Sequence, residues 1–141
     1  MVIVDSCVWI ESFRFQGSLH VQVALNNLLG ELQAAFCDPI KLEVLGPLTL
    51  ERRKRMTHYY SVVPYIPMPD RIWELARELS WKLRDSGLTL PWNDILIATT
   101  ALEKNVRVYT LDKHFTEIAR LTGMRLYQPG HNGRYEPDTA P

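Results

Sequence analysis

Four acidic residues stand where a folded chain could bring them together. Asp5 ends a short run of β-branched residues, and Asp112 follows a second such run. Asp94 lies in the first turn of a predicted helix, and Glu43 lies in another predicted helix between apolar neighbours. Because an open parallel sheet binds its ligands beyond the carboxyl ends of its strands, we expect Asp5 and Asp112 to share one edge.

Each acid also has a simple structural explanation. Asp5 and Asp112 can cap the helices that follow them, Asp94 suits a first helical turn, and Glu43 can be a solvated helix residue. These explanations do not account for several acids close together, because neighbouring carboxylates repel one another. Two carboxylates roughly 4–5 Å apart repel by about 3–4 kcal/mol at an effective dielectric constant near 20. A divalent cation removes that repulsion, and oxygen ligands favour Mg²⁺ or Mn²⁺ over zinc. If the acids converge, the sequence therefore predicts a site for a hard divalent ion.

Other chemistries are disfavoured by spacing. The four histidines lack the spacing of a zinc site, and Ser6 lacks the glycine-rich turn of a serine nucleophile. Cys7 stands where a phosphatase of the haloacid dehalogenase type would carry a second aspartate. Cys7 and Cys37 are too few for a disulfide scaffold, so we expect buried thiols in a reducing compartment, and a single disulfide between them stays open as the alternative.

The elements that must position the acids alternate between strand and helix, which predicts an α/β fold. We expect a central parallel sheet of four to five short strands flanked by helices. Strands are predicted at 1–4, 106–110 and 124–127, and at most a short strand is expected around Ile66. Helices are predicted at 6–14, 19–29, 38–45, 49–60, 91–105 and 113–122. A further predicted helix is capped by Asp70 and ends before Gly87. Residues 1–128 form one predicted domain. Residues 129–141 offer almost nothing to bury and predict a flexible tail.

Composition limits the partners of the chain. Its 141 residues carry 16 Lys and Arg and 16 Asp and Glu, so the formal charge is zero and a strongly basic nucleic-acid binder is not indicated. A local patch remains, because the basic run 52–55 is followed by His58 and two tyrosines, which suits phosphate contacts and base stacking as well as a solvated helix face. No apolar run is long enough to cross a bilayer and no secretory signal is visible, so we expect a cytoplasmic protein.

Four segments resemble the motifs of a known family. They are Ile3-Val4-Asp5-Ser6-Cys7-Val8-Trp9-Ile10-Glu11, Pro39-Ile40-Lys41-Leu42-Glu43-Val44-Leu45-Gly46, Pro91-Trp92-Asn93-Asp94-Ile95-Leu96-Ile97-Ala98-Thr99-Thr100-Ala101 and Tyr109-Thr110-Leu111-Asp112-Lys113-His114-Phe115. They look like the successive motifs of PIN-domain ribonucleases, in particular VapC toxins. The resemblance runs in the right order from residue 1 to about residue 128.

The resemblance implies a function. It implies that Asp5, Glu43, Asp94 and Asp112 form an acidic pocket that binds Mg²⁺, with Mn²⁺ as a substitute. It also implies that the protein hydrolyses RNA with water as the nucleophile. Ser6, Thr110 and Asn93 become supporting residues, and Arg52 and Arg55 become contacts for RNA or for an antitoxin. A VapB-like antitoxin and a homodimer are the implied partners.

Two positions depart from the family pattern. His114 stands where many relatives carry a further acid, and Cys7 replaces a common small hydroxyl residue. Two alternatives stay open: a housekeeping PIN nuclease of RNA maturation, and a catalytically silent module that binds RNA or protein, in which the acids are structural.

Overall fold

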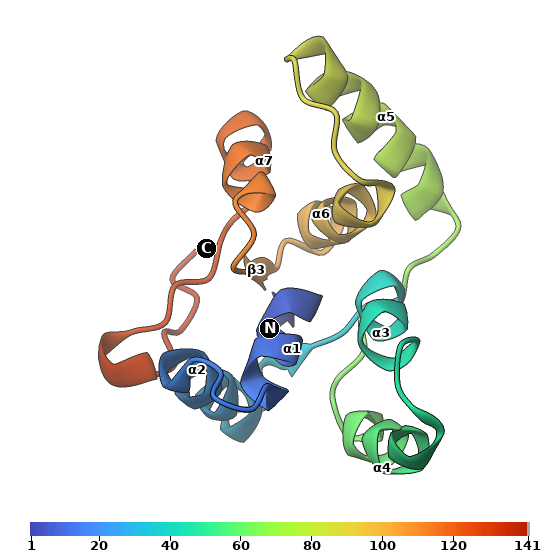
Figure 1. The fold of residues 1–141 in the computed structure, drawn as a ribbon. Helices are drawn as coiled ribbons and strands as arrows, with labels where there is room; N and C mark the ends of the chain where they lie inside the picture. Colours follow the sequence, from blue (N-terminus) through green and yellow to red (C-terminus); the bar gives the residue numbers. More distant parts are fainter. Residues whose placement is uncertain (141) are drawn as a thin grey trace.

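A three-stranded parallel sheet forms the centre of the protein. The computed structural model describes residues 1–140 (Figure 1). Its strands are β1 (Val2–Val4), β2 (Ala34–Ala35) and β3 (Arg107–Tyr109), in the order β2-β1-β3. Ile3 of β1 lies opposite Ala35 of β2 and Val108 of β3. The predicted α/β fold with a parallel sheet between helices is confirmed.

The outer strands of the expected sheet are reduced to single bridges. Phe36 pairs in parallel with Tyr65 beyond β2, and Val108 pairs in parallel with Leu126 beyond β3. The last predicted strand, 124–127, is therefore one bridge, supported by the bond from the Tyr127 N–H to the Val108 carbonyl at 2.8 Å. Within residues 1–140, three strands and two bridges take the place of the four to five strands expected.

Helices surround this sheet (Figure 1). Their bounds are α1 (Ser6–Phe13), α2 (Leu19–Gly30), α3 (Asp38–Leu45), α4 (Leu50–Ser61), α5 (Arg71–Asp85), α6 (Trp92–Lys104) and α7 (His114–Thr122). Contacts link them in the order α2, α1, α3, α6, α7, while α5 packs on α6 and α4 packs on α3. No helix within residues 1–140 is both long enough and apolar enough to cross a bilayer.

Burial explains why β1 and α6 hold the centre. All three residues of β1 are fully buried, as expected for a central strand covered on both faces. The run 94–101 of α6 is buried without interruption, because α3, α5 and α7 all pack against this helix. Its buried Thr99 and Thr100 hydroxyls donate to the carbonyls of Ile95 and Leu96, four residues earlier, which satisfies both polar groups.

The sequence predicts that the C-terminal residues bury almost nothing, but in the structure part of this segment packs against the domain. A short 3₁₀ turn, η1 (His131–Gly133), packs against α2, where the side-chain amide of Asn27 donates to the Gly133 carbonyl at 2.7 Å. Gly133 is buried with φ of 76°, and an added Cβ would lie 3.0 Å from Val23. The ring of Tyr135 stacks on that of Tyr127. Flexibility of the segment in solution stays a prediction, and residue 141 lies outside the described residues.

Candidate active site

The carboxyl ends of β1 and β3 meet at one edge of the sheet and carry two of the four acids. Asp5 directly follows β1, and Asp112 lies three residues beyond the end of β3. The chain continues from β1 to β2 on one side and returns as β3 on the other, so this edge is the point where strand order reverses. In open α/β sheets, such a point is the usual ligand-binding crevice.

Asp5 is held rigidly between strand and helix. Its Oδ1 accepts a hydrogen bond from the Ser6 N–H at 2.8 Å, which caps α1, and its Oδ2 accepts one from the Thr110 hydroxyl at 2.7 Å. The Cys7 thiol donates to the same Oδ2 at 3.3 Å. Burial raises the pKa of Asp5 above its ordinary value, these hydrogen bonds lower it, and the charge of Glu43 raises it further.

Glu43 reaches the same edge from α3. The Ser6 hydroxyl of α1 donates to its Oε2, and the Asn93 amide of α6 donates to its Oε1. Two of the three predicted supporting residues therefore contact this carboxylate, and they come from two different helices, whereas the third, Thr110, contacts Asp5. Because Asn93 precedes Asp94 in α6, the bond also ties Glu43 to the element that carries the third acid.

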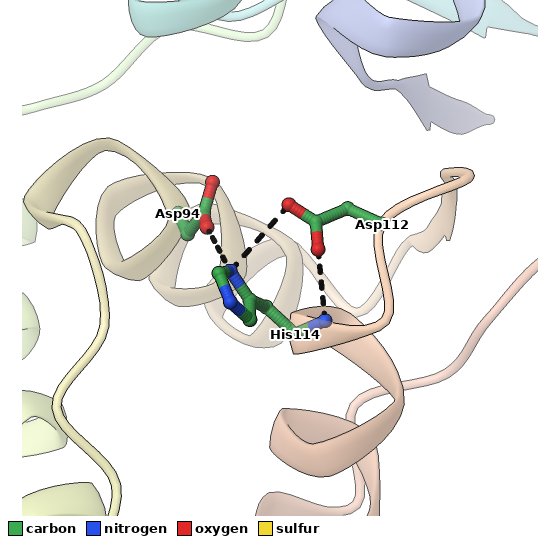
Figure 2. A group of neighbouring side chains, drawn as sticks. All are labelled: Asp94, Asp112 and His114. Atoms are coloured by element: carbon green, nitrogen blue, oxygen red, sulfur yellow. Dashed lines mark hydrogen bonds and ion pairs between the residues drawn. The ribbon is translucent and has the colours of Figure 1, made fainter.

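Asp94, Asp112 and His114 form a tight group (Figure 2). The His114 Nδ1 lies 3.1 Å from Asp94 Oδ2 and 3.5 Å from Asp112 Oδ2. Burial raises the pKa of Asp94; the hydrogen bond with His114 lowers it, and the charges of Asp112 and Asp5 raise it. One ligand atom from each of the three residues lies within 4.8 Å of the others.

The charge of Glu43 raises the pKa of Asp5, and the charges of Asp112 and Asp5 raise the pKa of Asp94. Of the four acids, Asp94 and Asp112 belong to the group with His114 whose ligand atoms lie within 4.8 Å of one another, and Asp5 and Glu43 lie outside that group. Asp5 and Asp94 are almost completely buried. Buried like charges repel unless a cation lies between them, and the carboxylate oxygens are hard donors. The donor set therefore fits a hard divalent ion, while the catalytic role of each acid stays a prediction.

Comparison with known proteins identifies the family. The sequence pattern of the PIN domain matches residues 2–121. The chain belongs to the PIN-domain family. It is also 32% identical over 130 residues to the VapC ribonuclease Mb1587 of Mycobacterium bovis and to Ribonuclease VapC11 of Mycobacterium tuberculosis, covering 89% of this chain and 96% of each relative.

Solved structures share the fold of this PIN domain. FitAB bound to an IR36 DNA fragment aligns with a TM-score of 0.76 and 18% identity, covering 97% of this chain and 99% of the matched chain. VapBC2 from Rickettsia felis, bound to a promoter DNA fragment, aligns with a TM-score of 0.71 and 18% identity, covering 90% of this chain and 98% of the other.

The two predicted arginine contacts of this PIN domain occupy different positions. Arg52 of α4 lines a groove of 320 Å³ whose other walls include Trp9, Phe13 and Tyr60. Arg55 is exposed on the same helix but is not among the residues that line this groove. The sequence predicts the same contact for Arg52 and Arg55, but only Arg52 lines the groove.

Two further residues of this PIN domain contact the acids. His114 appears in the sequence only as a departure from the family pattern, and its contact with Asp94 depends on how α6 and α7 pack, so local sequence gives no signal for it. Cys7 contacts Asp5, and burial raises the pKa of its thiol to about 11, which keeps it protonated near neutral pH. Cys7 is half-buried and Cys37 is buried, and burial raises the pKa of the Cys37 thiol to about 12.

Proposed function

We propose that the protein is a metal-dependent endoribonuclease that acts in the cytoplasm as the toxin of a type II toxin–antitoxin system. The observation that supports the proposal is the arrangement of the acids at the strand-order reversal of the sheet. Asp94 and Asp112 lie within ligand distance of each other, and Ser6, whose N–H donates to Asp5, also donates through its hydroxyl to Glu43. The similarity to relatives named VapC ribonucleases supports RNA as the substrate.

In the proposed reaction, Asp5, Asp94 and Asp112 would hold Mg²⁺, or Mn²⁺ in its place. When bound, the ion would supply a Lewis acid for a phosphate oxygen and a water molecule of lowered pKa as the nucleophile. Glu43 would bind the ion beside these acids or orient the attacking water; the hydrogen bonds from Ser6 and Asn93 to its two oxygens support this role. Thr110 holds Asp5 in its orientation. Because water attacks, we expect products with a 5′-phosphate and a 3′-hydroxyl.

A fluorogenic RNA assay tests this mechanism. We expect Asp94→Asn, or EDTA, to lower the cleavage rate by about a hundredfold or more, since the carboxylate and the ion together stabilise charge in the transition state. Asp85→Asn, which removes an exposed carboxylate at the end of α5, is the matched control and keeps full activity. Undiminished cleavage in EDTA or by Asp94→Asn would refute the proposal, and cyclic phosphate ends would refute attack by water.

A growth assay separates the toxin from the two alternatives. Expression of the protein without a partner should arrest growth, and expression of Asp94→Asn should not. A housekeeping nuclease cleaves RNA without arresting growth. A silent binding module neither cleaves RNA nor binds Mg²⁺ at millimolar concentration.

For the antitoxin, we propose the groove lined by Arg52. Its apolar walls include Trp9, Ile10, Phe13 and Tyr60, and it also carries Arg14, so it suits a segment with apolar and acidic residues. Toxin–antitoxin complexes among the fold relatives support a partner of this kind. Arg52→Glu should prevent copurification with an antitoxin expressed from a neighbouring short reading frame, whereas the control Lys54→Glu should not.

For the homodimer, we propose a second and larger groove, of 610 Å³, between α3, α5 and α6. Its walls include Leu42, Trp73 and Trp92, each of which exposes more than half of its surface. Large exposed apolar side chains that gather in one place are typical of protein interfaces. The twofold arrangement would cover these side chains with the same groove of a second copy.

A further inference from the structure

We propose that His114 binds the divalent ion directly through Nδ1, and that this nitrogen ligand shifts the preference of the site from Mg²⁺ toward transition-metal ions such as Mn²⁺. The inference rests on the proposed function, because it requires an ion held by Asp94 and Asp112. It adds a ligand and a selectivity that the acids alone do not provide.

The positions of the three side chains suit ligands of one ion. The His114 Nδ1 lies 3.1 Å from Asp94 Oδ2 and 3.5 Å from Asp112 Oδ2. Neighbouring ligands of an octahedral ion at bond lengths of about 2.1 Å are separated by about 3 Å. The imidazole nitrogen is thus already spaced from both carboxylate oxygens as a co-ligand would be, and Figure 2 shows it directed between them.

The backbone keeps His114 in this position. Its N–H donates to Asp112 Oδ1 at 2.9 Å, which leaves the Oδ2 of the same carboxylate beside the imidazole ring. His114 is also the first residue of α7, a helix that packs against α6, and α6 carries Asp94. The side chain of His114 is 49% exposed and that of Asp94 is 10% exposed, so the imidazole is the more solvent-exposed member of this pair.

The chemistry of the nitrogen decides the selectivity. Mg²⁺ prefers oxygen ligands and retains its waters, so an imidazole adds little to its binding. First-row transition ions accept imidazole readily, and their affinity for nitrogen sites increases from Mn²⁺ towards Cu²⁺. An acid at position 114 would complete an all-oxygen site suited to Mg²⁺. A histidine there favours a mixed site.

Metal titration with matched variants tests the inference. Calorimetry gives the affinities of the protein for Mn²⁺ and for Mg²⁺, and pulsed electron paramagnetic resonance of bound Mn²⁺ detects nitrogen in its coordination sphere. The variants are His114→Asp, His114→Ala, Asp94→Asn, and His20→Ala as a control that removes an exposed histidine of α2. Circular dichroism of each variant checks that it is folded.

We expect a nitrogen signal in the native protein and in His20→Ala, and none in His114→Asp or His114→Ala. The ratio of Mn²⁺ to Mg²⁺ affinity should fall by about tenfold or more in His114→Asp. If ions bind and Asp94→Asn weakens them, but the nitrogen signal is absent and the ratio is unchanged, the inference is overturned while the proposed function stands. If no ion binds to the native protein, both are overturned.

Discussion

At the scale of single residues, the position of Glu43 depends on side chains from two other helices. Ser6 and Asn93 donate to its two oxygens, so neither oxygen is free to rotate away from the other acids. We expect Asn93→Ala to lower kcat by about 10–100-fold with little change in KM, because orientation and not RNA binding is lost. Steady-state cleavage over a range of RNA concentrations measures this, with Asn26→Ala of α2 as the control. A change confined to KM would assign Asn93 to RNA binding instead.

Asp94 gives a prediction for stability. Burial, and then the charges of Asp112 and Asp5, raise its pKa above the ordinary 3.8, so the folded state favours the protonated carboxyl. The stability that this provides is complete below pH 3.8 and is lost as the pH rises through the raised pKa. Asp94→Asn avoids the loss, and we expect it to be more stable than the native protein at pH 7 in EDTA by about 1 kcal/mol.

Urea unfolding at pH 4.5 and pH 7 measures this difference in free energy. The gap should widen with pH, and excess Mn²⁺ should reverse it by stabilising only the native protein. Asp85→Asn controls for the removal of a carboxylate elsewhere. A native protein more stable than Asp94→Asn at pH 7 in EDTA would contradict the prediction.

At the scale of elements, the sequence predicts the strands and helices that carry strong patterns. The apolar run before Asp5 predicts β1, and the spacing of Ile72, Leu75, Ala76, Leu79 and Leu83 predicts α5. All of these α5 residues are buried except Leu75, which is half-buried. Strand β2 has no such signal, because it consists of Ala34 and Ala35, which lack β-branched side chains. It exists because β1 pairs with it, and this tertiary cause is invisible locally.

In the candidate site, too, some positions have a local sequence signal and others depend on tertiary packing. Asp5 and Asp112 follow recognisable strands, so topology alone predicts that they share an edge. The position of Glu43 follows only from the family resemblance, since nothing in 38–45 by itself directs that side chain to the sheet edge. The contact between His114 and Asp94 needs the packing of α6 on α7, which pairs residues 20 positions apart.

The C-terminal segment provides a test at this scale. The Asn27 amide donates to the Gly133 carbonyl at 2.7 Å, and Asp138 pairs with Arg125 and with the buried Arg107. If these contacts persist in solution, Asn27→Ala should lower the free energy of unfolding by about 1 kcal/mol and speed hydrogen exchange across residues 129–140. Asn26→Ala, next to it and exposed, should do neither. Equal behaviour of the two variants would support the flexible tail that the sequence predicts.

At the scale of the whole molecule, exposed tryptophans distinguish two surfaces. Trp73 and Trp81 both lie on α5, with exposed fractions of 59% and 58%. Trp73 lines the groove with Trp92 and Leu42, whereas Trp81 carries the guanidinium of Arg77 over its ring. If the groove is the dimer interface, Trp73→Ser should raise the dimer dissociation constant by at least about tenfold, since buried tryptophans dominate interface energies.

Light scattering with chromatography over a concentration series measures that constant. Trp81→Ser removes an equally exposed tryptophan from the same helix and should leave it unchanged. A native protein that is monomeric at all concentrations, or a dimer insensitive to Trp73→Ser, would contradict the assignment of this groove.

Three of the acids lie at the starts of helices: Asp5 caps α1, Asp94 is in the first turn of α6, and Asp112 precedes α7. The unpaired N–H groups at each helix start carry partial positive charge, which offsets a nearby carboxylate by about 0.3–1 kcal/mol. The helix N-termini thus offset part of the negative charge of these acids, and they do so whether or not an ion is bound. Removal of the divalent ion with a chelator should therefore abolish RNA cleavage without unfolding the protein. Adding the ion back should restore full activity over repeated cycles.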